Sequence, residues 1–313
     1  MSAVDTYDVV IIGGGAAGLS AALLLGRARR RVAVVDAGQP RNVRAEHIHG
    51  YLTRDGVPPA RFLEVAREEV RSYGVELVDA IAQEVRPDRC VQLADGRLLT
   101  ARQIILATGL KDVLPEIEGA DERWGRGLFQ CPYCHGWEHQ DRALAVLGTA
   151  ESSVQQALLV RQFSTDVTLF THGMEALDGQ DADALASRGV KVVEGRVRAL
   201  VGGSGSLAGV RMGNGDLHAC EALFYEPDAT VDTSIVQVPE CRTGENGCVS
   251  TDQTGRTSVD GVWAVGNAAD PAAQVITAAG DAYRLAVAVN AALIDDDVAA
   301  ATGQLRQCVV QGS

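Results

Sequence analysis

The chain has 313 residues, enough for two domains of ordinary size, and 46% of them are apolar, which is enough to form a hydrophobic core in each. Its net charge of −13 argues against a nucleic-acid partner and against electrostatic binding to an anionic membrane. Five of the seven cysteines are scattered, so the chain lacks a disulfide framework and a reducing cytoplasm is the expected location.

Residues 9–26 contain no charge and are long enough to be considered a transmembrane helix. We favour another interpretation. The acidic residues Asp5 and Asp8 precede this segment, where a signal peptide would carry positive charge. The five glycines within it follow a nucleotide-binding pattern, so no membrane span is expected.

That pattern begins with a β-branched run at 7–12, which predicts a buried strand. A glycine-rich loop follows, then a helix over 16–28 and a second buried strand over 31–35. In a dinucleotide-binding loop the first glycine makes the turn, the second admits the pyrophosphate and the third packs the helix on the strand. The phosphates lie at the helix N-terminus and an acid binds the ribose. The candidate residues are Gly13, Gly15, Ala16, Ala17, Gly18 and Asp36.

Residues 38–59 form a long loop that carries Arg41, Asn42, His47 and His49, and loops of this length are usually functional or disordered. A charged amphipathic helix is expected over 59–72. Strands are expected over 75–78, 90–93, 97–100 and 103–107, with a hairpin turn at 95–96.

The nucleotide-binding pattern then recurs. A strand at 143–147 precedes GTAESS at 148–153, a helix at 154–162 and a strand at 167–170. Hairpin strands follow, and 222–225 corresponds to 104–107. The first fold resumes with a strand at 261–265 and a helix from about 274 to 293. The sequence therefore predicts an α/β protein with two Rossmann-like, three-layer ββα domains, the second inserted in the first: 1–114, 115–241 and 242–313.

Between the two patterns lies CPYCHGWE at 131–138. Paired cysteines at this spacing occur in zinc sites, in c-type haem attachment and in redox dithiols. Zinc needs four ligands, and Cys131, Cys134 and His139 supply three, with no second CxxC or HxxxH. The motif alone leaves the redox and haem interpretations open. The nucleotide-binding patterns on both sides favour a redox dithiol and no metal.

GGGAAG at 13–18, ATG at 107–109, CxxC at 131–134, VWAVGN at 262–267 and AQVITAAG at 273–280 occur in this order. With this combination the chain resembles the low-molecular-weight thioredoxin reductase family over essentially its whole length. The resemblance implies an FAD domain made of both chain ends, a middle domain carrying the cysteines, and a homodimer.

The resemblance also implies residue roles. Cys134 would face the flavin and form the covalent or charge-transfer adduct, and Cys131 would be the thiol that meets substrate. Gly266 and Asn267 match a glycine-acid pair near the ribityl chain and phosphates, with Asn267 replacing the acid. The other cofactor-binding positions are Arg41, Asn42, Thr108, Gly109, Gln274 and Val275, the last two beside the flavin pyrimidine edge.

Three departures from the reductase pattern matter. Ala150 replaces the second glycine of the second loop, so its Cβ stands where a pyrophosphate needs close approach. Residues 171–173 offer no arginine for the 2′-phosphate of NADPH. His135 replaces the acid that follows the second cysteine in thioredoxin reductases.

CPYCHGWE is instead similar to the dithiol oxidases of that superfamily, which close disulfides in natural products such as holomycin, gliotoxin and romidepsin. The resemblance implies FAD, molecular oxygen as acceptor and a small-molecule dithiol as substrate, without NADPH. Thiolate is the nucleophile, so a base is needed, and His135 suits that role near neutral pH. His139 is a weaker candidate, and His47 and His49 are weaker still.

Two other functions stay open at this point. The first is an NADPH-dependent disulfide reductase, or a ferredoxin-linked relative, which would run electrons in the other direction. The second is a flavin-bound regulatory protein that senses redox state. The intact Cys131–Cys134 pair argues against the second, because a pure binding module has no need of a dithiol.

Overall fold

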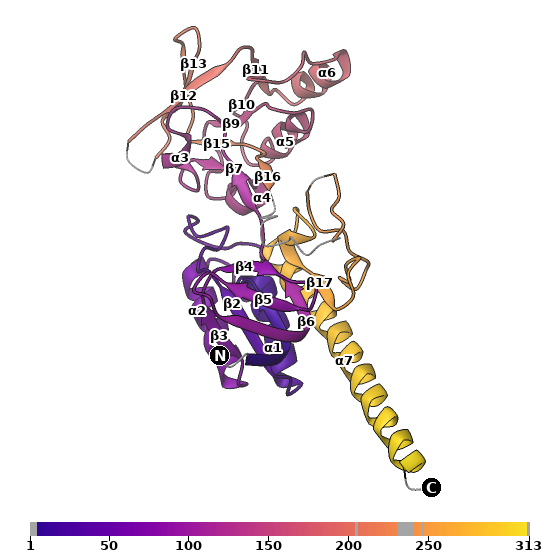
Figure 1. Cartoon of the computed structure of the whole chain (residues 1–313). Coiled ribbons are helices and arrows are strands. Elements are labelled where there is room, and N and C mark those ends of the chain that lie inside the picture. The colour runs from indigo at the N-terminus through magenta and orange to yellow at the C-terminus, as the bar shows by residue number, and fades with distance from the viewer. Residues whose placement is uncertain (1–4, 204–205, 231–240, 246, 312–313) are drawn as a thin grey trace. The chain divides into compact units, whose positions relative to one another are not determined.

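The computed structural model describes residues 5–203, 206–230, 241–245 and 247–311. The chain folds as two compact units, whose elements are labelled in Figure 1. The outer unit comprises Met1–Arg41, Ala60–Lys111 and Ala229–Ser313, and the middle unit comprises Asn42–Pro59 and Asp112–Asp228. Each has its own parallel sheet, which confirms the predicted α/β fold. The domain boundaries predicted from the sequence, at 114/115 and 241/242, remain predictions.

The outer unit is built on a seven-stranded sheet in the order β3-β2-β1-β6-β5-β4, with β17 also paired to β6. Its parallel strands are β1 (Asp5–Ile12), β2 (Val32–Asp36), β3 (Glu76–Asp79), β6 (Leu98–Leu106) and β17 (Val262–Ala264). The antiparallel strands are β4 (Ala82–Val85) and β5 (Cys90–Leu93).

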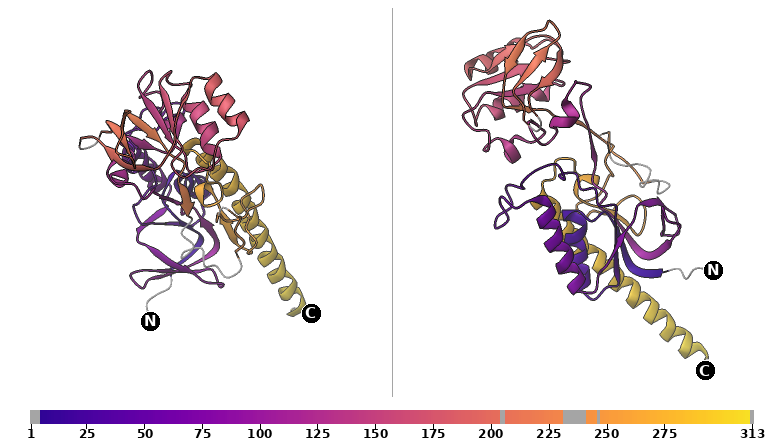
Figure 2. Two further views of the ribbon diagram at one scale, coloured as in Figure 1. Left: turned by 90° about the horizontal axis from the view of Figure 1, so that it is seen from above. Right: turned by 90° about the vertical axis from the view of Figure 1, so that its left-hand side faces the viewer.

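Alternation of side chains along β1 produces two cores, because successive residues of a strand point to opposite faces. Val9 and Ile11 pack on the face covered by α1 (Ala16–Arg27) and α7 (Val275–Gln311), and Val70 of α2 (Pro59–Ser72) joins the same core. Val10 and Ile12 pack against the β4–β5 hairpin and residues near Val249 on the other face. This is the predicted three-layer arrangement. Figure 2 shows α1 in indigo beside α7 in yellow.

The middle unit repeats the plan with a five-stranded, all-parallel sheet in the order β11-β10-β9-β15-β8. One face packs on α5 (Ser152–Val160) and α6 (Gly179–Ser187), and the other on the antiparallel sheet β12-β13-β14. The strands are β8 (Leu128–Phe129), β9 (Leu144–Leu147), β10 (Val167–Phe170), β11 (Lys191–Val193), β12 (Val197–Val201), β13 (Gly209–Met212), β14 (Leu217–Ala219) and β15 (Ala222–Phe224). Strand β15 pairs with β9 as β6 pairs with β1, so the duplication is confirmed.

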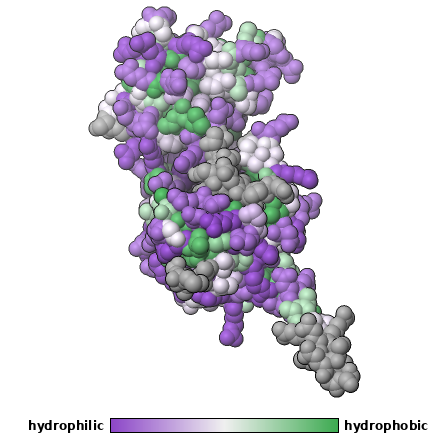
Figure 3. All heavy atoms as spheres, viewed as in Figure 1, coloured by the Kyte–Doolittle hydropathy of each residue, from purple (hydrophilic) through white to green (hydrophobic). Residues whose placement is uncertain are grey.

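The face of the molecule in Figure 3 is mostly hydrophilic. Several short elements complete the chain. They are α3 (Ala120–Arg123), α4 (Pro132–His135), the 3₁₀ helix η1 (Gly266–Ala268), and β7 (Lys111–Val113) with β16 (Asp228–Thr230), which pair as a two-stranded sheet. Among the described residues, no helix has the length and apolar character that crossing a membrane requires.

Two predicted elements were wrong in extent. The strands expected at 97–100 and 103–107 are one strand, β6, whose first half pairs with β5 and whose second half pairs with β17. The last helix was expected to end near 293 but continues to Gln311. No proline lies between 294 and 311, and Ala299, Ala300 and Ala301 are strong helix formers, so the helix can continue. Strand β4 and helix α6 were missed because both are short and largely polar.

Candidate active site

The first nucleotide loop lies at the carboxyl edge of the parallel strands, where open α/β sheets bind ligands. Gly13 follows β1 with φ +108°, a conformation that favours glycine, and a Cβ there would lie 2.2 Å from the Ala107 carbonyl oxygen. A Cβ on Gly18 would lie 1.9 Å from the Gly13 oxygen, so this glycine allows close helix-strand packing. A Cβ on Gly15 would meet nothing within 4 Å, which leaves its outer side open to a phosphate group.

Other unsatisfied polar groups lie at the same edge. Gly15 is the N-cap of α1 and supplies no side-chain cap, so the first N–H groups of that helix remain available to an anion. The Thr108 hydroxyl is buried without a hydrogen-bond partner. A Cβ on Gly266 would lie 2.9 Å from Ala17, so η1 packs directly against the start of α1. The outer unit thus brings residues from both chain ends to one anion-binding edge, and a dinucleotide cofactor such as FAD fits it.

Asp36 ends β2 as predicted, but its carboxylate is already engaged. It forms an ion pair with Arg67 of α2 and accepts a hydrogen bond from the Gly38 N–H at 3.2 Å. A carboxylate has about four lone-pair sites, so it can still accept a ribose hydroxyl. Arg67 was not singled out from the sequence, since its partner lies 31 residues away. It fixes the orientation of Asp36.

Asn267 has a structural contact that the sequence did not predict. Its side-chain amide nitrogen lies 3.0–3.2 Å from the carbonyl oxygens of Asp270, Pro271 and Ala273. These contacts order the turn that leads from η1 into α7, which begins at Val275 directly after Gln274. The roles of Gln274, Val275 and Gly109 toward a flavin stay predictions. Arg41 and Asn42 fall on the two sides of the division between the units, and their roles also stay predictions.

In the middle unit, the two cysteines of the CxxC motif form a disulfide, Cys131–Cys134. Strand β8 ends at Phe129, and Cys131 is then the N-cap of the short helix α4. The Cys134 backbone N–H donates to Cys131 Sγ at 3.1 Å. The turn requires glycine at position 136, because a Cβ there would lie 2.6 Å from Phe163 and from the Pro132 oxygen. The local sequence therefore builds a tight, half-buried redox disulfide.

His135 stacks on the ring of Phe129, with centroids 4.3 Å apart and planes 26° from parallel. Burial lowers the pKa of His135 to about 4, and the nearby rings of His139 and His49 act in the same direction. The imidazole is therefore neutral at physiological pH and has a nitrogen lone pair that can accept a proton. The predicted base with a pKa near neutrality requires revision, because the sequence did not reveal the packing on Phe129.

The other histidines form a network around the motif. His139 lies 5.2 Å from the Phe129 ring, and its buried Nδ1 lacks a hydrogen-bond partner. Burial lowers its pKa as well. His49, from the loop at 42–59, lies 3.4 Å from Glu138 through Nε2 and 3.4 Å from Asp55 through Nδ1. His47 and His49 have ring centroids 6.1 Å apart. His49 thus connects its loop to the CxxC segment, a contact that sequence separation concealed.

The second nucleotide loop is occupied by the protein's own side chains. The Oγ atom of the fully buried Ser153 accepts the N–H groups of Thr149 at 3.2 Å and Ala150 at 3.3 Å. A Cβ on Gly148 would lie 2.3 Å from the Met174 sulfur, so that side chain covers the first glycine. In a dinucleotide site such N–H groups bind the pyrophosphate.

The turn after β10 is also tied down. His172 Nδ1 accepts the Val197 N–H at 3.0 Å, and Thr171 Oγ1 accepts the Gly195 N–H at 3.2 Å. Burial, together with the nearby Arg196, lowers the pKa of His172. Both side chains therefore serve the protein's own backbone at the position where an arginine pair would bind a 2′-phosphate.

Two aromatic residues of the motif were not singled out from the sequence. Tyr133, between the cysteines, is 75% exposed, and Trp137 is 67% exposed. Large exposed aromatic side chains beside a redox disulfide are available to contact a substrate. Among the described residues, no group of three or more His, Cys, Asp or Glu side chains is arranged to hold a metal ion.

A redox disulfide in a chain that also has nucleotide-binding folds defines a flavin-dependent disulfide oxidoreductase. The chain belongs to the pyridine nucleotide-disulphide oxidoreductase family, whose model matches residues 7–290, and within it the chain is thioredoxin reductase-like.

Individual proteins resemble it to different extents. The crystal structure of HlmI shares 44% identity over 98% of this chain and 97% of that chain, with a TM-score of 0.91. Thioredoxin reductase sirT of Leptosphaeria maculans is 30% identical over 94% of this chain and 96% of its own length. A probable thioredoxin reductase of Arthroderma benhamiae is 36% identical over 179 residues, and the chain spans 44% of that longer protein.

Proposed function

We propose that this protein is an FAD-dependent dithiol oxidase that forms an intramolecular disulfide in a small-molecule dithiol and uses molecular oxygen as acceptor. The observation that carries the proposal is the contrast within the middle unit. The unit has the Cys131–Cys134 disulfide, while Ser153 occupies the N–H groups with which its loop would bind NADPH. The similarity to HlmI over nearly the whole chain supports an oxidase in preference to a reductase.

The cysteines perform the thiol chemistry. One substrate thiolate attacks Cys131 Sγ, the Cys131–Cys134 bond breaks, and Cys134 leaves as a thiolate. The second substrate thiolate attacks the substrate sulfur of the mixed disulfide, and Cys131 leaves. The Cys134 N–H, 3.1 Å from Cys131 Sγ, stabilises the charge that develops there. FAD, when bound, supplies the two-electron oxidation that restores the disulfide, with oxygen reduced to hydrogen peroxide.

His135 accepts the proton of a substrate thiol in this proposal. Its neutral ring is adjacent in sequence to Cys134 and is held by the Phe129 stack. With a pKa of about 4, His135 is a weak base and generates little thiolate. A nearby negative charge or the bound substrate would raise the pKa of His135 and make it a stronger base. The Cys134 thiolate formed in the first step is such a charge.

The substrate class follows from the surroundings of the disulfide. Tyr133 and Trp137 present apolar ring surface with a polar edge, which suits a compact organic dithiol. The net charge of −13 is unfavourable for highly anionic substrates. We therefore assign a neutral or weakly charged small molecule to this site.

An anaerobic stopped-flow experiment tests the proposal. The FAD-loaded protein is mixed with dithiothreitol, NADPH or NADH, and flavin absorbance is followed before air is admitted. Bleaching by dithiothreitol alone, with yellow colour and hydrogen peroxide appearing in air, is expected. Rapid bleaching by NADPH would replace the oxidase with a reductase.

The second candidate is an NADPH-dependent thioredoxin-disulfide reductase. Several relatives are named thioredoxin reductases, including sirT and the 31% identical tcpT of Claviceps purpurea. It requires the loop at 148–153 to exchange the Ser153 hydroxyl for a pyrophosphate, at the cost of two hydrogen bonds. The same stopped-flow experiment separates the two candidates.

A further inference from the structure

The most exposed large apolar side chains of this protein gather in two segments of the middle unit. Among the residues that the structure describes, the four with the highest exposed fractions are Leu52 (82%), Tyr133, Trp137 and Val43 (64%). Two of them lie beside the redox disulfide and two lie in the loop at 42–59, which belongs to the same unit. A single exposed apolar residue is ordinary, whereas a group of them beside a reactive site indicates a binding surface.

The loop at 42–59 is held on the middle unit at two places. The Arg44 guanidinium group donates to the Asp121 carbonyl oxygen at 2.6 Å. Farther along the loop, His49 Nε2 lies 3.4 Å from the carboxylate of Glu138, the last residue of the CPYCHGWE motif. The loop is therefore anchored to the segment that carries the disulfide.

Residues 48–57 close into a small hairpin with Leu52 near its tip. The Ile48 N–H donates to the Val57 oxygen at 2.9 Å and joins the two ends of the hairpin. Thr53, directly after Leu52, has φ +73°, a left-handed conformation that is unfavourable for a β-branched residue. Such strain persists only where the surrounding structure fixes it, and it clusters in segments that contact ligands.

The hairpin tip lies close to the motif. Three residues of chain span at most about 11 Å, which limits the distance between the Cα atoms of Leu52 and His49. His49 contacts Glu138. Burial lowers the pKa of His135 to about 4, and His49 is near enough to act in the same direction. Leu52 is therefore a neighbour of the segment that a substrate must reach.

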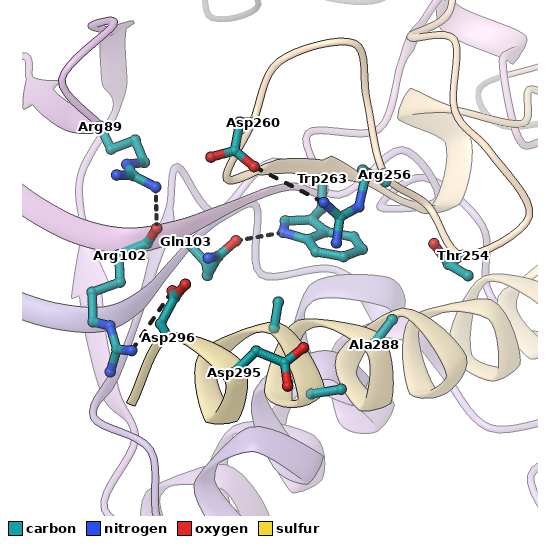
Figure 4. A pocket seen from close by; sticks show the side chains of 12 residues that line it. Arg89, Arg102, Gln103, Thr254, Arg256, Asp260, Trp263, Ala288, Asp295 and Asp296 are labelled. Carbon is teal, nitrogen blue, oxygen red and sulfur yellow. Dashed lines mark hydrogen bonds and ion pairs between the residues drawn. The ribbon is translucent and has the colours of Figure 1, made fainter. Parts of the chain in front are cut away.

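A cavity of about 660 Å³ in the outer unit offers no comparable site for a dithiol (Figure 4). None of the described residues that border it is a cysteine, so a substrate bound there meets no disulfide. Its charged groups also face one another: Arg256 lies 3.9 Å from Asp260, and Arg102 lies 3.7 Å from Asp296. An apolar dithiol would instead cover the exposed apolar side chains of the middle unit.

We propose that the hairpin at 48–57 forms a wall of the substrate site and recognises the apolar skeleton of the dithiol. Leu52 is the contact residue, and His49 positions the hairpin through Glu138. This inference rests on the proposed oxidase function. One substrate thiolate reaches Cys131, while the carbon skeleton that joins the two thiols lies against Leu52 and the aromatic side chains of the motif. The hairpin thus selects dithiols with an apolar skeleton.

Steady-state kinetics of the full-length, FAD-loaded protein in air test the hairpin with two probes, dithiothreitol and ortho-benzenedimethanethiol. Leu52→Ser removes most of the apolar contact. The ratio of kcat/KM for the aromatic dithiol to kcat/KM for dithiothreitol should therefore fall about tenfold, through KM. Leu217→Ser is the matched control, since Leu217 is 57% exposed on β14 of the same unit, and it should keep the wild-type ratio. A wild-type ratio in Leu52→Ser overturns the proposal.

His49→Ala tests how the hairpin is positioned. It should lower the same ratio by about three- to tenfold, again through KM, because the hairpin loses its contact with Glu138. Adding Leu52→Ser to His49→Ala should then have little further effect, since both changes remove the same substrate contact. Fully additive losses would show that His49 acts independently of the hairpin and would remove its positioning role.

The same assay separates the hairpin from the oxidase function on which it rests. If the wild-type protein oxidises neither dithiol in air, the oxidase function fails and the hairpin has no substrate to select. If it oxidises both and the Leu52→Ser ratio is unchanged, the hairpin proposal alone fails. Reduced thioredoxin serves as a protein dithiol, and a loss in Leu52→Ser that is confined to thioredoxin would assign the surface to a protein partner and contradict the proposal.

Discussion

The two nucleotide loops of this protein share a fold and differ in what fills them. In the outer unit, Gly15 faces open space and the N-terminus of α1 has no side-chain cap. In the middle unit, Ala150 occupies the position equivalent to Gly15. Ser153 occupies the position equivalent to Gly18, and its hydroxyl oxygen accepts hydrogen bonds from two N–H groups of the loop. A serine hydroxyl there satisfies groups that a pyrophosphate would otherwise bind.

The difference shows how a duplicated fold can divide its roles. A nucleotide loop is costly to leave unfilled, because buried N–H groups need partners. The outer unit leaves such groups for its cofactor. The middle unit satisfies them internally and keeps the sheet as a rigid support for the disulfide after β8. A reductase needs both loops, whereas an oxidase that receives electrons from a dithiol needs only the first.

The largest expected effect comes from placing the same bulk in each loop. Gly15→Val sets a branched side chain where the pyrophosphate approaches, so we expect a colourless protein without FAD. Ala150→Val is the matched substitution in the middle unit, and we expect full FAD content and dithiol oxidation. Flavin absorbance per chain after purification measures both. Full FAD occupancy in Gly15→Val would remove the cofactor assignment from the first loop.

The cysteines are expected to have unequal roles although both are required for turnover. Cys131→Ser leaves Cys134 to interact with the flavin, so we expect a long-wavelength charge-transfer band at alkaline pH. Cys134→Ser should lack this band, because the remaining thiol is the one that meets substrate. Absorbance spectra of the two FAD-loaded variants across a pH series make the comparison. A band in Cys134→Ser alone would reverse the two assignments.

His135→Ala is expected to retain FAD and fold but to oxidise a dithiol ~10²–10⁴-fold more slowly, the usual loss for a general base. The deficit should shrink as pH rises and the substrate thiolate forms unaided. Because the pKa of His135 is lowered to about 4, the wild-type rate should show no inflection near pH 6.5 from this residue. Steady-state rates between pH 5 and 9 test this, with His47→Ala as a control outside the Phe129 stack. Equal pH profiles for the variant and the wild type would assign His135 a structural role.

Local patterns predicted most of the fold, including the strand, glycine loop and helix at the N-terminus and the inserted second copy. Those signals are short in range, since a buried strand or a glycine turn depends on neighbouring residues. The same is true of Cys131 and Cys134, which are three positions apart in the sequence and were predicted to act together as a redox dithiol.

Contacts between distant residues account for what the sequence did not predict. The Arg67–Asp36 ion pair, the His49–Glu138 contact and the packing of His135 on Phe129 each join separate elements. The sequence includes Ser153 as the last residue of the second loop, but only the burial of its side chain in the structure shows that it fills that loop. The continuation of α7 past 293 was missed because Asp295, Asp296 and Asp297 interrupt the apolar pattern from which that helix was predicted.

A smaller effect is expected from reopening the second loop. Ala150→Gly with Ser153→Ala frees the loop N–H groups, and Gly173→Arg adds a guanidinium where a Cβ meets nothing within 4 Å. One charge-assisted contact contributes ~1.5–3 kcal/mol, so NADPH affinity should rise by about 10–100-fold. Titration calorimetry measures the change, and NADH is the control because it lacks the 2′-phosphate. An equal gain for NADH would show that the arginine acts without recognising that phosphate.

The smallest expected effect is a difference in acid stability between the two units. All six histidines lie between 42 and 228, within the middle unit, and burial lowers the pKa of His135, His139 and His172. The unfolded chain, with histidine pKa values of about 6.5, then binds more protons than the folded chain below that pH. The stabilisation is therefore complete above about pH 6.5 and is lost as pH falls toward the lowered values. The outer unit has no histidine and lacks this contribution.

Hydrogen exchange at pH 7 and pH 5, corrected for the intrinsic rate, should show the middle unit losing protection while the outer unit changes less. His135→Gln removes one titrating group, so its melting temperature should fall less between these pH values than that of the wild type. For a unit slightly smaller than 150 residues each kcal/mol corresponds to about 4 °C, so a difference of a few degrees is expected. An equal loss of protection in both units would mean that carboxylates, which both units contain, govern the acid response and that the buried histidines do not.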